Sequence, residues 1–337
     1  MATMRAMQIA KAKGDFELVE RPVPEPGPGQ IRIKVEACGI CYSDRYVKDG
    51  LNPAVQYPRV PGHEAVGIVD KLGDGVTVWQ PGQRVGVGWH GGHCFVCKPC
   101  RNGDFINCDN RKTTGMTHDG GYAEYMITKQ EAAAPVPEKL TAVDAAPLLC
   151  AGITVFNALR HSGAVGGDTV AVHGIGGLGH LAVQFCDKMG FRTVAISGSA
   201  QKEKLARDLG ADEYIDASST NPIDALTKMG GADVILSTAP VGGNIGDYAA
   251  GLAPNGRLIL LAGTGGKTEI QLPALIRGRR SIKGWASGSA TDWEDTMNFC
   301  ALTGARAMVE TFPLEKVQDG YDKMMRNEMR FRGVVTV

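Results

Sequence analysis

The sequence predicts an α/β protein with two domains, and three observations support this. At 337 residues the chain has the length of two ordinary domains. Up to about residue 150, short β-like segments alternate with turns rich in Gly and Pro; further on, apolar strands alternate with helices. A G-x-G-x-x-G motif stands between the first of these later strands and its helix. We therefore expect a mostly antiparallel β domain followed by a doubly wound parallel sheet.

The first domain is predicted from β-like segments at 31–35, 64–69 and 84–87. The stretches PEPGPGQ, PGHE, LGDG and QPGQ separate these segments, and their Gly and Pro residues favour turns over helices. An irregular β domain follows from this pattern.

The second domain begins near Asp168, where the rhythm of the sequence changes. Apolar runs predict parallel strands at 169–173, 193–196, 233–236, 258–261 and 281–283, and amphipathic runs predict helices at 178–189 and 201–209. The tail from Asp292 predicts one or two helices and a final β-like segment, FRGVVTV.

The bulk composition excludes several classes of function. Lys+Arg and Asp+Glu number 36 each, so no charge excess favours nucleic acid or an anionic membrane. No apolar run reaches membrane-spanning length, and MATMRAMQIAKAKGDF lacks the uninterrupted apolar stretch of a secretory signal. We therefore expect a cytoplasmic protein whose cysteines bind metal or react rather than form disulfides.

Four cysteines lie close together in the segment CFVCKPCRNGDFINC, at Cys94, Cys97, Cys100 and Cys108. Thiolates at this spacing can converge on one tetrahedral zinc, which leaves no position for a substrate. The pattern therefore predicts a structural zinc site. Four unmetallated thiols, or the zinc ribbon of a binding module, are the alternatives.

The G-x-G-x-x-G motif predicts a dinucleotide-binding loop. It follows the strand TVAV and opens a helix, which is the context this fingerprint requires. Gly174 would form the tight turn, Gly176 would let the backbone approach a pyrophosphate, and Gly179 would allow close helix–sheet packing. The motif residues expected at the cofactor are Gly174, Gly176, Gly177, Leu178 and Gly179. A turn that binds no nucleotide is the alternative.

The end of the next strand favours NADP over NAD. NAD-preferring loops carry an acidic residue there, hydrogen-bonded to the ribose 2′-hydroxyl. This chain instead has Ser197 and Ser199, with Lys202 shortly after, and these residues suit a 2′-phosphate. Alternatively, the two serines only end a strand and cap the next helix.

A second, open metal site is sought among the remaining Cys and His residues, because a catalytic zinc needs three protein ligands. The candidates are Cys41 in ACGICYSD, His63 in VPGHEAVG and Cys150 in PLLCAGITVF. Their long spacing does not prove that they converge. Cys38 competes with Cys41, His63 could be a turn residue, and Cys150 could be a packed core cysteine.

The combination of motifs resembles one family over nearly the whole chain. CGICYSD, GHEAVG, the four-cysteine loop, DGGYAEY, CAGIT and HGIGGLG occur in the order of zinc-dependent medium-chain alcohol dehydrogenases. The resemblance implies a GroES-like catalytic domain at 1–151, completed by 291–337, and a Rossmann domain at 152–290. It implies a catalytic zinc on Cys41, His63 and Cys150, a Cys2His ligand set already known for that family. It also implies two zincs per subunit and hydride exchange between an alcohol and NAD(P).

Further roles follow only from this resemblance. Glu64 matches a glutamate that approaches the metal, Asp44 a carboxylate that orients the histidine ligand, and Ser43 the first hydroxyl of a proton relay. Each has a simpler alternative: a strand-start carboxylate for Glu64, and ordinary turn residues for Asp44 and Ser43.

Four further residues are interpreted by the same comparison. Many members have histidine where this chain has Tyr46, so Tyr46 either passes the proton on or lines the pocket. Arg332 matches an arginine at the cofactor pyrophosphate, with a surface arginine as the alternative. Trp89 and Tyr57 match substrate-pocket aromatics, or are plain core residues.

Other functions remain open at this point. The same fold without a catalytic metal would be an enoyl or quinone reductase, although such relatives generally lack these ligands. A zinc enzyme acting on polyols is a closer alternative. The family likeness also implies a homo-oligomer, a dimer or tetramer, with a small-molecule substrate.

Overall fold

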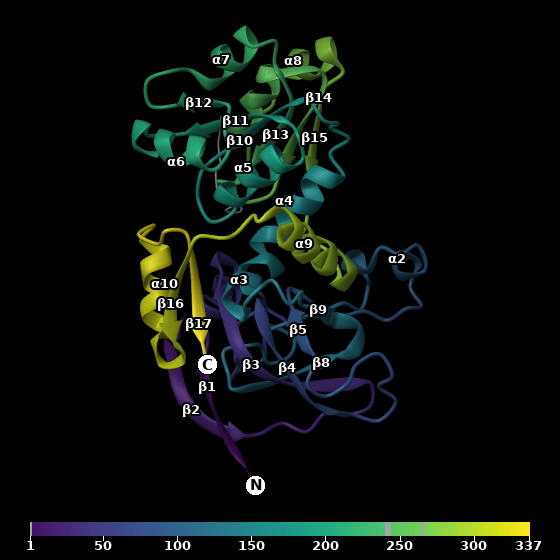
Figure 1. Ribbon diagram of the computed structural model, residues 1–337. Coiled ribbons are helices and arrows are strands. Elements are labelled where there is room, and N and C mark those ends of the chain that lie inside the picture. Colours follow the sequence, from purple (N-terminus) through teal and green to yellow (C-terminus); the bar gives the residue numbers. More distant parts are fainter. Residues whose placement is uncertain (1, 240–243, 264–265) are drawn as a thin grey trace. The chain divides into compact units, whose positions relative to one another are not determined.

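The computed structural model describes residues 2–239, 244–263 and 266–337. The chain divides into two compact units (Figure 1). The first unit comprises Met1–Ile153 and Ser287–Val337, so the end of the chain returns to it, and the second comprises Thr154–Ala286.

The first unit is built on a seven-stranded sheet with the order β16-β17-β3-β4-β5-β9, and β8 pairs with β3. Its pairs are antiparallel except β16–β17, which confirms the expected mostly antiparallel domain. In β3, Ile31, Ile33 and Val35 are buried in alternation with more exposed charged residues, as a half-buried strand requires. The strands of this unit are β1 (Thr3–Ile9), β2 (Phe16–Pro22), β3 (Gln30–Ile40), β4 (Ala65–Leu72), β5 (Arg84–Val87), β6 (His90–Gly92), β7 (Lys112–Thr113), β8 (Tyr125–Lys129), β9 (Ala134–Pro135), β16 (Val309–Pro313) and β17 (Arg332–Thr336).

Short helices connect these strands, and two longer ones precede β16 and β17. The α-helices are α1 (Arg45–Lys48), α2 (Lys98–Arg101), α3 (Ala142–Ala145), α9 (Ala290–Thr303) and α10 (Val317–Met325), while α4 (Ala151–Arg160) leads into the second unit. The 3-10 helices are η1 (Tyr42–Asp44), η2 (Phe105–Asn107), η3 (Gln130–Ala132), η4 (Ala146–Leu149) and η7 (Leu314–Lys316). A Ser289 capping box starts α9, and Gly304, at a φ of 80°, ends it.

The second unit contains a six-stranded, wholly parallel sheet with the order β12-β11-β10-β13-β14-β15. This is the strand order of dinucleotide-binding sheets, in which the direction of strand addition reverses between β10 and β13. Its strands are β10 (Thr169–His173), β11 (Arg192–Ser197), β12 (Glu213–Asp216), β13 (Ala232–Ser237), β14 (Leu252–Leu260) and β15 (Ser281–Gly284).

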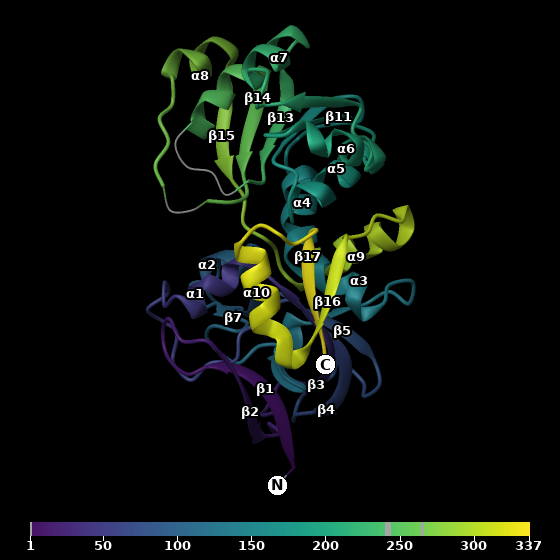
Figure 2. The same cartoon turned by 90° about the vertical axis from the view of Figure 1, so that its left-hand side faces the viewer.

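Helices cover both faces of this parallel sheet. Right-handed crossovers on either side of the reversal place α5 and α6 on one face and α7 and α8 on the other (Figure 2). Both faces of the central strands are therefore buried, which explains why the sequence shows them as continuous apolar runs. The helices are α5 (Gly179–Lys188), α6 (Glu203–Asp208), α7 (Pro222–Lys228) and α8 (Leu272–Gly278), with the 3-10 helices η5 (Ala200–Lys202) and η6 (Asn244–Gly251).

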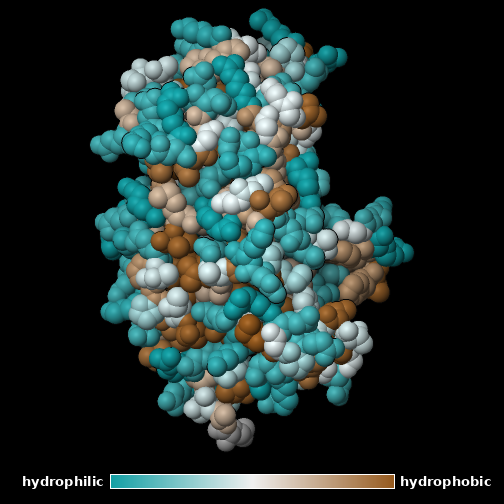
Figure 3. All heavy atoms as spheres, viewed as in Figure 1, coloured by the Kyte–Doolittle hydropathy of each residue, from teal (hydrophilic) through white to brown (hydrophobic). Residues whose placement is uncertain are grey.

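The surface is mostly polar, with scattered apolar side chains on the face seen in Figure 3. Among the described residues, no single helix has the length and apolar character needed to cross a membrane. One pair, Ala142–Leu149 with Ala151–Arg160, bent by 56°, would meet the test by length and composition alone.

Candidate metal centre and cofactor loop

The end of β3 fixes the position of Cys41. Cys41 caps η1: its backbone N–H donates to Asp44 Oδ2 at 3.0 Å, and its Sγ accepts from the Ser43 N–H at 3.5 Å. The turn therefore presents the Cys41 sulfur in one orientation.

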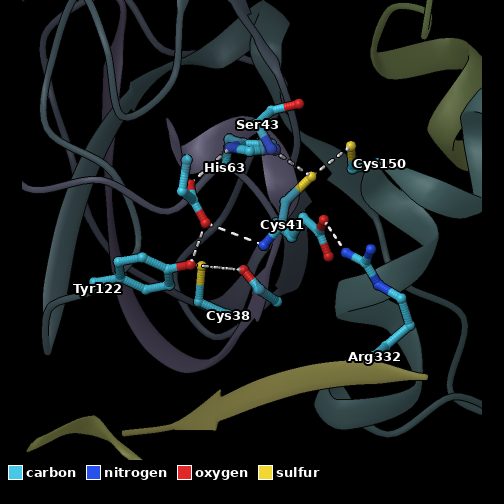
Figure 4. Close-up of polar contacts among 10 residues, drawn as sticks. Cys38, Cys41, Ser43, His63, Tyr122, Cys150 and Arg332 are labelled. Carbon is cyan, nitrogen blue, oxygen red and sulfur yellow. Dashed lines mark hydrogen bonds and ion pairs between the residues drawn. The ribbon is translucent and has the colours of Figure 1, made fainter. Parts of the chain in front are cut away.

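His63 lies in the loop before β4, and Asp44 holds its imidazole. Asp44 Oδ1 is 3.3 Å from His63 Nδ1, and the Tyr122 hydroxyl donates to Asp44 Oδ2 at 2.6 Å (Figure 4). His63 is 3% exposed, and its Nε2 has no hydrogen-bond partner in the described part of the chain. A buried, unpartnered ring nitrogen whose opposite nitrogen faces a carboxylate is the arrangement found in histidine metal ligands.

Cys150, between η4 and α4, completes a convergent set of ligands. One ligand atom from each of Cys41, His63, Glu64 and Cys150 lies within 4.8 Å of all the others. The Sγ atoms of Cys41 and Cys150 are 3.7 Å apart. Two sulfurs bound at about 2.3 Å to one tetrahedral zinc lie about 3.8 Å apart, so the residues present fit zinc.

Protons and a metal would compete for the ligand atoms of this site. The hydrogen bond from Cys150 holds the pKa of Cys41 well below its usual value, and this contact together with burial raises the pKa of Cys150. Burial lowers the pKa of His63, but the Cys41 thiolate and Asp44 outweigh it and raise the pKa well above its usual value. Without a metal, protons would therefore occupy the centre, and binding a metal would displace them.

Glu64 makes an ion pair that the sequence did not predict. It is fully buried, and its Oε1 accepts from Arg332 Nη2, in β17 (Figure 4). Burial raises the pKa of Glu64 to about 7, even though Arg332 opposes the shift. Arg332 is only 4% exposed, so the alternative of a surface arginine is wrong.

One expected pocket aromatic, Trp89, lies beside the candidate ligand His63, and Tyr46 lies next to Trp89. The Trp89 ring meets the His63 ring edge-on at 4.9 Å between centroids, and Tyr46 meets Trp89 at 6.1 Å. Tyr57, the other expected pocket aromatic, packs its ring on the core of the first unit. Its hydroxyl donates to the Val47 carbonyl at 2.5 Å. The sequence suggested no role for Tyr122, whose hydroxyl supports Asp44.

The four-cysteine loop also forms a compact cluster. The ligand atoms of Cys94, Cys97, Cys100 and Cys108 lie within 4.8 Å of one another, and the Sγ atoms of Cys94 and Cys97 are 3.6 and 3.8 Å from that of Cys108. These separations suit tetrahedral zinc. Backbone N–H groups of Cys97 and Val96 lower the pKa of Cys94 to about 6, which favours the thiolate needed for ligation.

Cys38, the competitor of Cys41, and His93, the neighbour of Cys94 in the sequence, lie outside both clusters. Cys38 is fully buried in the core, and its Sγ is 3.8 Å from the Gly39 carbonyl oxygen. His93 stacks on Phe105 at 4.1 Å between ring centroids. Neither belongs to a metal-binding group among the described residues.

The glycine motif forms the turn between β10 and α5. Gly174 has a φ of 96°, which favours glycine, and a Cβ at Gly179 would lie 1.8 Å from the Gly174 carbonyl oxygen. A Cβ at Gly176 would meet no atom within 4 Å. The space beside Gly176 is where the backbone could approach a pyrophosphate, and Gly177 and Leu178 complete the turn into the helix. The loop therefore fits a dinucleotide.

The residues expected at a 2′-phosphate lie where β11 ends. Ser197 is the buried last residue of β11, and Ser199 Oγ accepts from the Gln201 N–H at 3.2 Å, so Ser199 does cap the next helix. The Tyr214 hydroxyl donates to the Ser199 carbonyl. Lys202 Nζ donates to the Ile175 carbonyl at 2.8 Å, which places the ammonium group next to the glycine turn.

Comparison with known proteins extends over the whole chain. The family model described as "Alcohol dehydrogenase GroES-like domain" matches residues 27–138, and "Zinc-binding dehydrogenase" matches 177–301. The chain is 46% identical to alcohol dehydrogenase patD of Penicillium expansum over 93% of this chain and 91% of that one. It is 34% identical to an alcohol dehydrogenase of Geobacillus stearothermophilus, covering 98% of each.

Solved structures agree with these matches. A cinnamyl alcohol dehydrogenase from Sorghum bicolor superposes with a TM-score of 0.90 at 30% identity, covering 99% of this chain and 98% of that one. A structure titled CAD from Helicobacter pylori, complexed with NADP(H), gives a TM-score of 0.89 at 25% identity, with coverage of 99% and 98%.

We predict that the two cysteine clusters respond differently to substitution. Cys100→Ser should remove one zinc and lower Tm by roughly 5–10 °C, because the loop loses its cross-link. Cys150→Ser should remove the other zinc and leave Tm nearly unchanged. Metal analysis and calorimetry measure both effects, and the reverse pattern would show that the two sites have been interchanged.

We predict that Asp44→Asn weakens zinc binding at the Cys41–His63–Cys150 centre about 10–100-fold, because the carboxylate facing His63 Nδ1 is lost. A chelator competition assay measures this affinity. Asp70→Asn, at a carboxylate that pairs with Arg32 away from the metal centre, is the matched control. Equal zinc retention in the two variants would argue against a supporting role for Asp44.

Proposed function

The chain belongs to the medium-chain zinc-type alcohol dehydrogenases, which are NAD(P)-dependent alcohol oxidoreductases, and we propose that its reaction takes place at one zinc held by Cys41, His63 and Cys150. A second zinc on the four-cysteine loop would be structural. The proposal rests on one observation above the others: the two sulfurs and the unpartnered His63 Nε2 converge in a buried site.

The residues around this centre have separate tasks in the reversible oxidation of a primary or secondary alcohol. When bound, zinc supplies Lewis-acid polarisation of the substrate oxygen, and the nicotinamide exchanges the hydride. Cys41 and Cys150 contribute thiolates, and Asp44 keeps the proton of His63 on Nδ1. Glu64, buried beside these ligands and paired with Arg332, would be the carboxylate that can approach the metal, as the family likeness implies.

The proton released from the alcohol must leave a buried site. Ser43, two residues after Cys41, is the proposed first acceptor, and the Tyr46 hydroxyl is the proposed second. The edge-on contact of Tyr46 with Trp89 is equally compatible with a purely lining role. If Tyr46 relays the proton, Tyr46→Phe should lower turnover at neutral pH, whereas an unchanged rate would leave it only the lining role.

The substrate class follows from the aromatic side chains beside the metal. Trp89 and Tyr46 offer flat apolar surfaces that suit a modest alkyl or aryl group. Relatives named as cinnamyl alcohol dehydrogenases support an aryl primary alcohol.

We further propose that NADP is the preferred cofactor, because no acidic side chain ends β11 and Lys202 lies beside the glycine turn. A homo-oligomer, a dimer or tetramer, is proposed from the family likeness alone. Light scattering of the purified protein would test the oligomeric state.

We predict that the protein oxidises primary aryl and alkyl alcohols with NADP, and that Cys150→Ser lowers turnover by at least about a thousandfold, because the metal ligand set is lost. Initial rates over a panel of alcohols and carbonyls, with NAD and NADP in parallel, measure this. Cys186→Ala, at a buried cysteine in α5 of the second unit, is the control. Full activity of Cys150→Ser would contradict the proposed centre.

We predict that Lys202→Gln raises KM for NADP about tenfold and changes KM for NAD little, because only NADP carries the 2′-phosphate. Lys204→Gln, at an exposed lysine that pairs with Asp208, is the matched control. An equal change for both cofactors would exclude a role for Lys202 at the 2′-phosphate.

A further inference from the structure

The segment from Asp119 to Tyr122 runs along the loop that carries His63. Three backbone hydrogen bonds join the two segments: Gly120 N–H donates to the Val60 carbonyl at 2.8 Å, Gly121 N–H to the Gly62 carbonyl at 2.9 Å, and Tyr122 N–H to the Pro61 carbonyl at 3.2 Å. A fourth hydrogen bond runs from the Val60 N–H to Asp119 Oδ1 and is 3.1 Å long. The backbone immediately before His63 is therefore held by this segment.

The two segments lie too close together for any side chain at Gly62. Gly62 has a φ of 95°, and a Cβ there would lie 2.9 Å from Cys38 Sγ and 2.9 Å from Tyr122 Cδ1. The Tyr122 ring also meets the Phe16 ring edge-on, at 5.9 Å between centroids. The ring of Tyr122 is therefore confined between the core and the residue that precedes His63.

From this position the Tyr122 hydroxyl reaches Asp44. Tyr122 is fully buried, and its hydroxyl donates to Asp44 Oδ2 at 2.6 Å, with the Gly39 carbonyl oxygen farther away at 3.2 Å (Figure 4). A phenol carries one proton, and a hydrogen bond to a charged acceptor is stronger than one to a neutral carbonyl. The single O–H of Tyr122 is therefore directed at the Asp44 carboxylate.

The two oxygens of the Asp44 carboxylate have different partners. Oδ2 accepts from the Tyr122 hydroxyl and, at 3.0 Å, from the Cys41 N–H, whereas Oδ1 lies 3.3 Å from His63 Nδ1. Two donors on Oδ2 oppose rotation of the carboxylate about its Cβ–Cγ bond, and a single donor would leave it freer to turn. The rotation that they fix keeps Oδ1 opposite His63 Nδ1.

The orientation of Asp44 decides which ring nitrogen of His63 can bind a metal. A carboxylate opposite Nδ1 accepts the Nδ1–H, and this leaves the lone pair on Nε2, the nitrogen with no partner among the described residues. A carboxylate that turned away would fix neither the tautomer nor the orientation of the His63 ring.

We propose that Tyr122 is a positioning residue for a zinc bound by Cys41, His63 and Cys150. Its hydroxyl holds the Asp44 carboxylate at the rotation that presents Oδ1 to His63, and its segment holds the loop that carries His63. The inference rests on the proposed function, because it requires zinc at that centre. Tyr122 itself belongs to neither metal-binding group of the described residues, so it acts through Asp44 and His63.

Tyr122→Phe tests the proposal, because it keeps the ring and its packing and removes only the hydroxyl. The variant should bind zinc at the Cys41–His63–Cys150 centre about fivefold more weakly, a smaller loss than in Asp44→Asn, because Tyr122 stands one contact further from the metal. Chelator competition on the full-length, zinc-loaded protein measures this affinity. The zinc on the four-cysteine loop should be retained.

A double-mutant cycle shows whether Tyr122 acts through Asp44. In the Asp44→Ala background the carboxylate is absent, so adding Tyr122→Phe should change zinc affinity by less than about twofold. An equal loss with and without the carboxylate would mean that the ring only packs, and would overturn the proposal.

Cadmium NMR gives a readout that a loss of stability alone does not change. In the cadmium-loaded protein, the site with a nitrogen ligand and the four-sulfur site should give separate resonances. Tyr122→Phe should shift the resonance of the Cys41–His63–Cys150 centre and leave that of the four-cysteine loop in place. An unchanged resonance of the first centre would contradict a positioning role.

Ile31→Val is the matched control for stability. Ile31 is a fully buried core residue near the start of β3, so this variant should lower Tm through a small cavity and keep the zinc affinity of the unmodified protein. Equal zinc affinity in Tyr122→Phe and the unmodified protein, or an equal loss in Ile31→Val, would overturn this inference alone. Absence of zinc from the centre of the unmodified protein would overturn the proposed function together with it.

Discussion

The hydrogen bonds that converge on the Asp44 carboxylate hold three separate segments of the chain in place. Its Oδ2 accepts from the Cys41 N–H and from the Tyr122 hydroxyl, and its Oδ1 faces His63 Nδ1. Asp44 is only 2% exposed, and a buried carboxylate without hydrogen bonds raises the free energy of the folded state. Loss of any one of these partners would therefore destabilise the whole buried group. The proposed metal ligands Cys41 and His63 are thereby fixed relative to one another by the protein alone.

The Glu64–Arg332 pair extends this support to the end of the chain. The two residues are 268 positions apart, yet β17 pairs with β3 and brings the guanidinium to the buried carboxylate. Removing either partner alone would leave an uncompensated buried charge. The C-terminal strand is therefore part of the metal centre's surroundings as well as of the sheet.

Local sequence patterns predicted the features that depend on near neighbours. The strands at 169–173 and 84–87, the glycine turn and the four-cysteine loop all combine residues close together in sequence. β12 was missed because its four residues, EYID, are partly exposed and too few to show a period. Family likeness, not spacing, singled out Cys41, His63 and Cys150. The Tyr122–Asp44 hydrogen bond and the Glu64–Arg332 pair join distant segments, and a single sequence carries no signal for such contacts.

The second and third glycines of the G-x-G-x-x-G motif, Gly176 and Gly179, are constrained in different ways. A side chain at Gly179 would collide with the Gly174 carbonyl, so the fold itself forbids it. A side chain at Gly176 would occupy empty space, so it would clash only with a bound cofactor. A descendant of this protein that gave up redox chemistry would therefore be free to change residue 176 while still keeping glycine at 179. Loss of glycine at 176 with glycine kept at 179 would therefore indicate that the fold is retained but the cofactor is no longer bound.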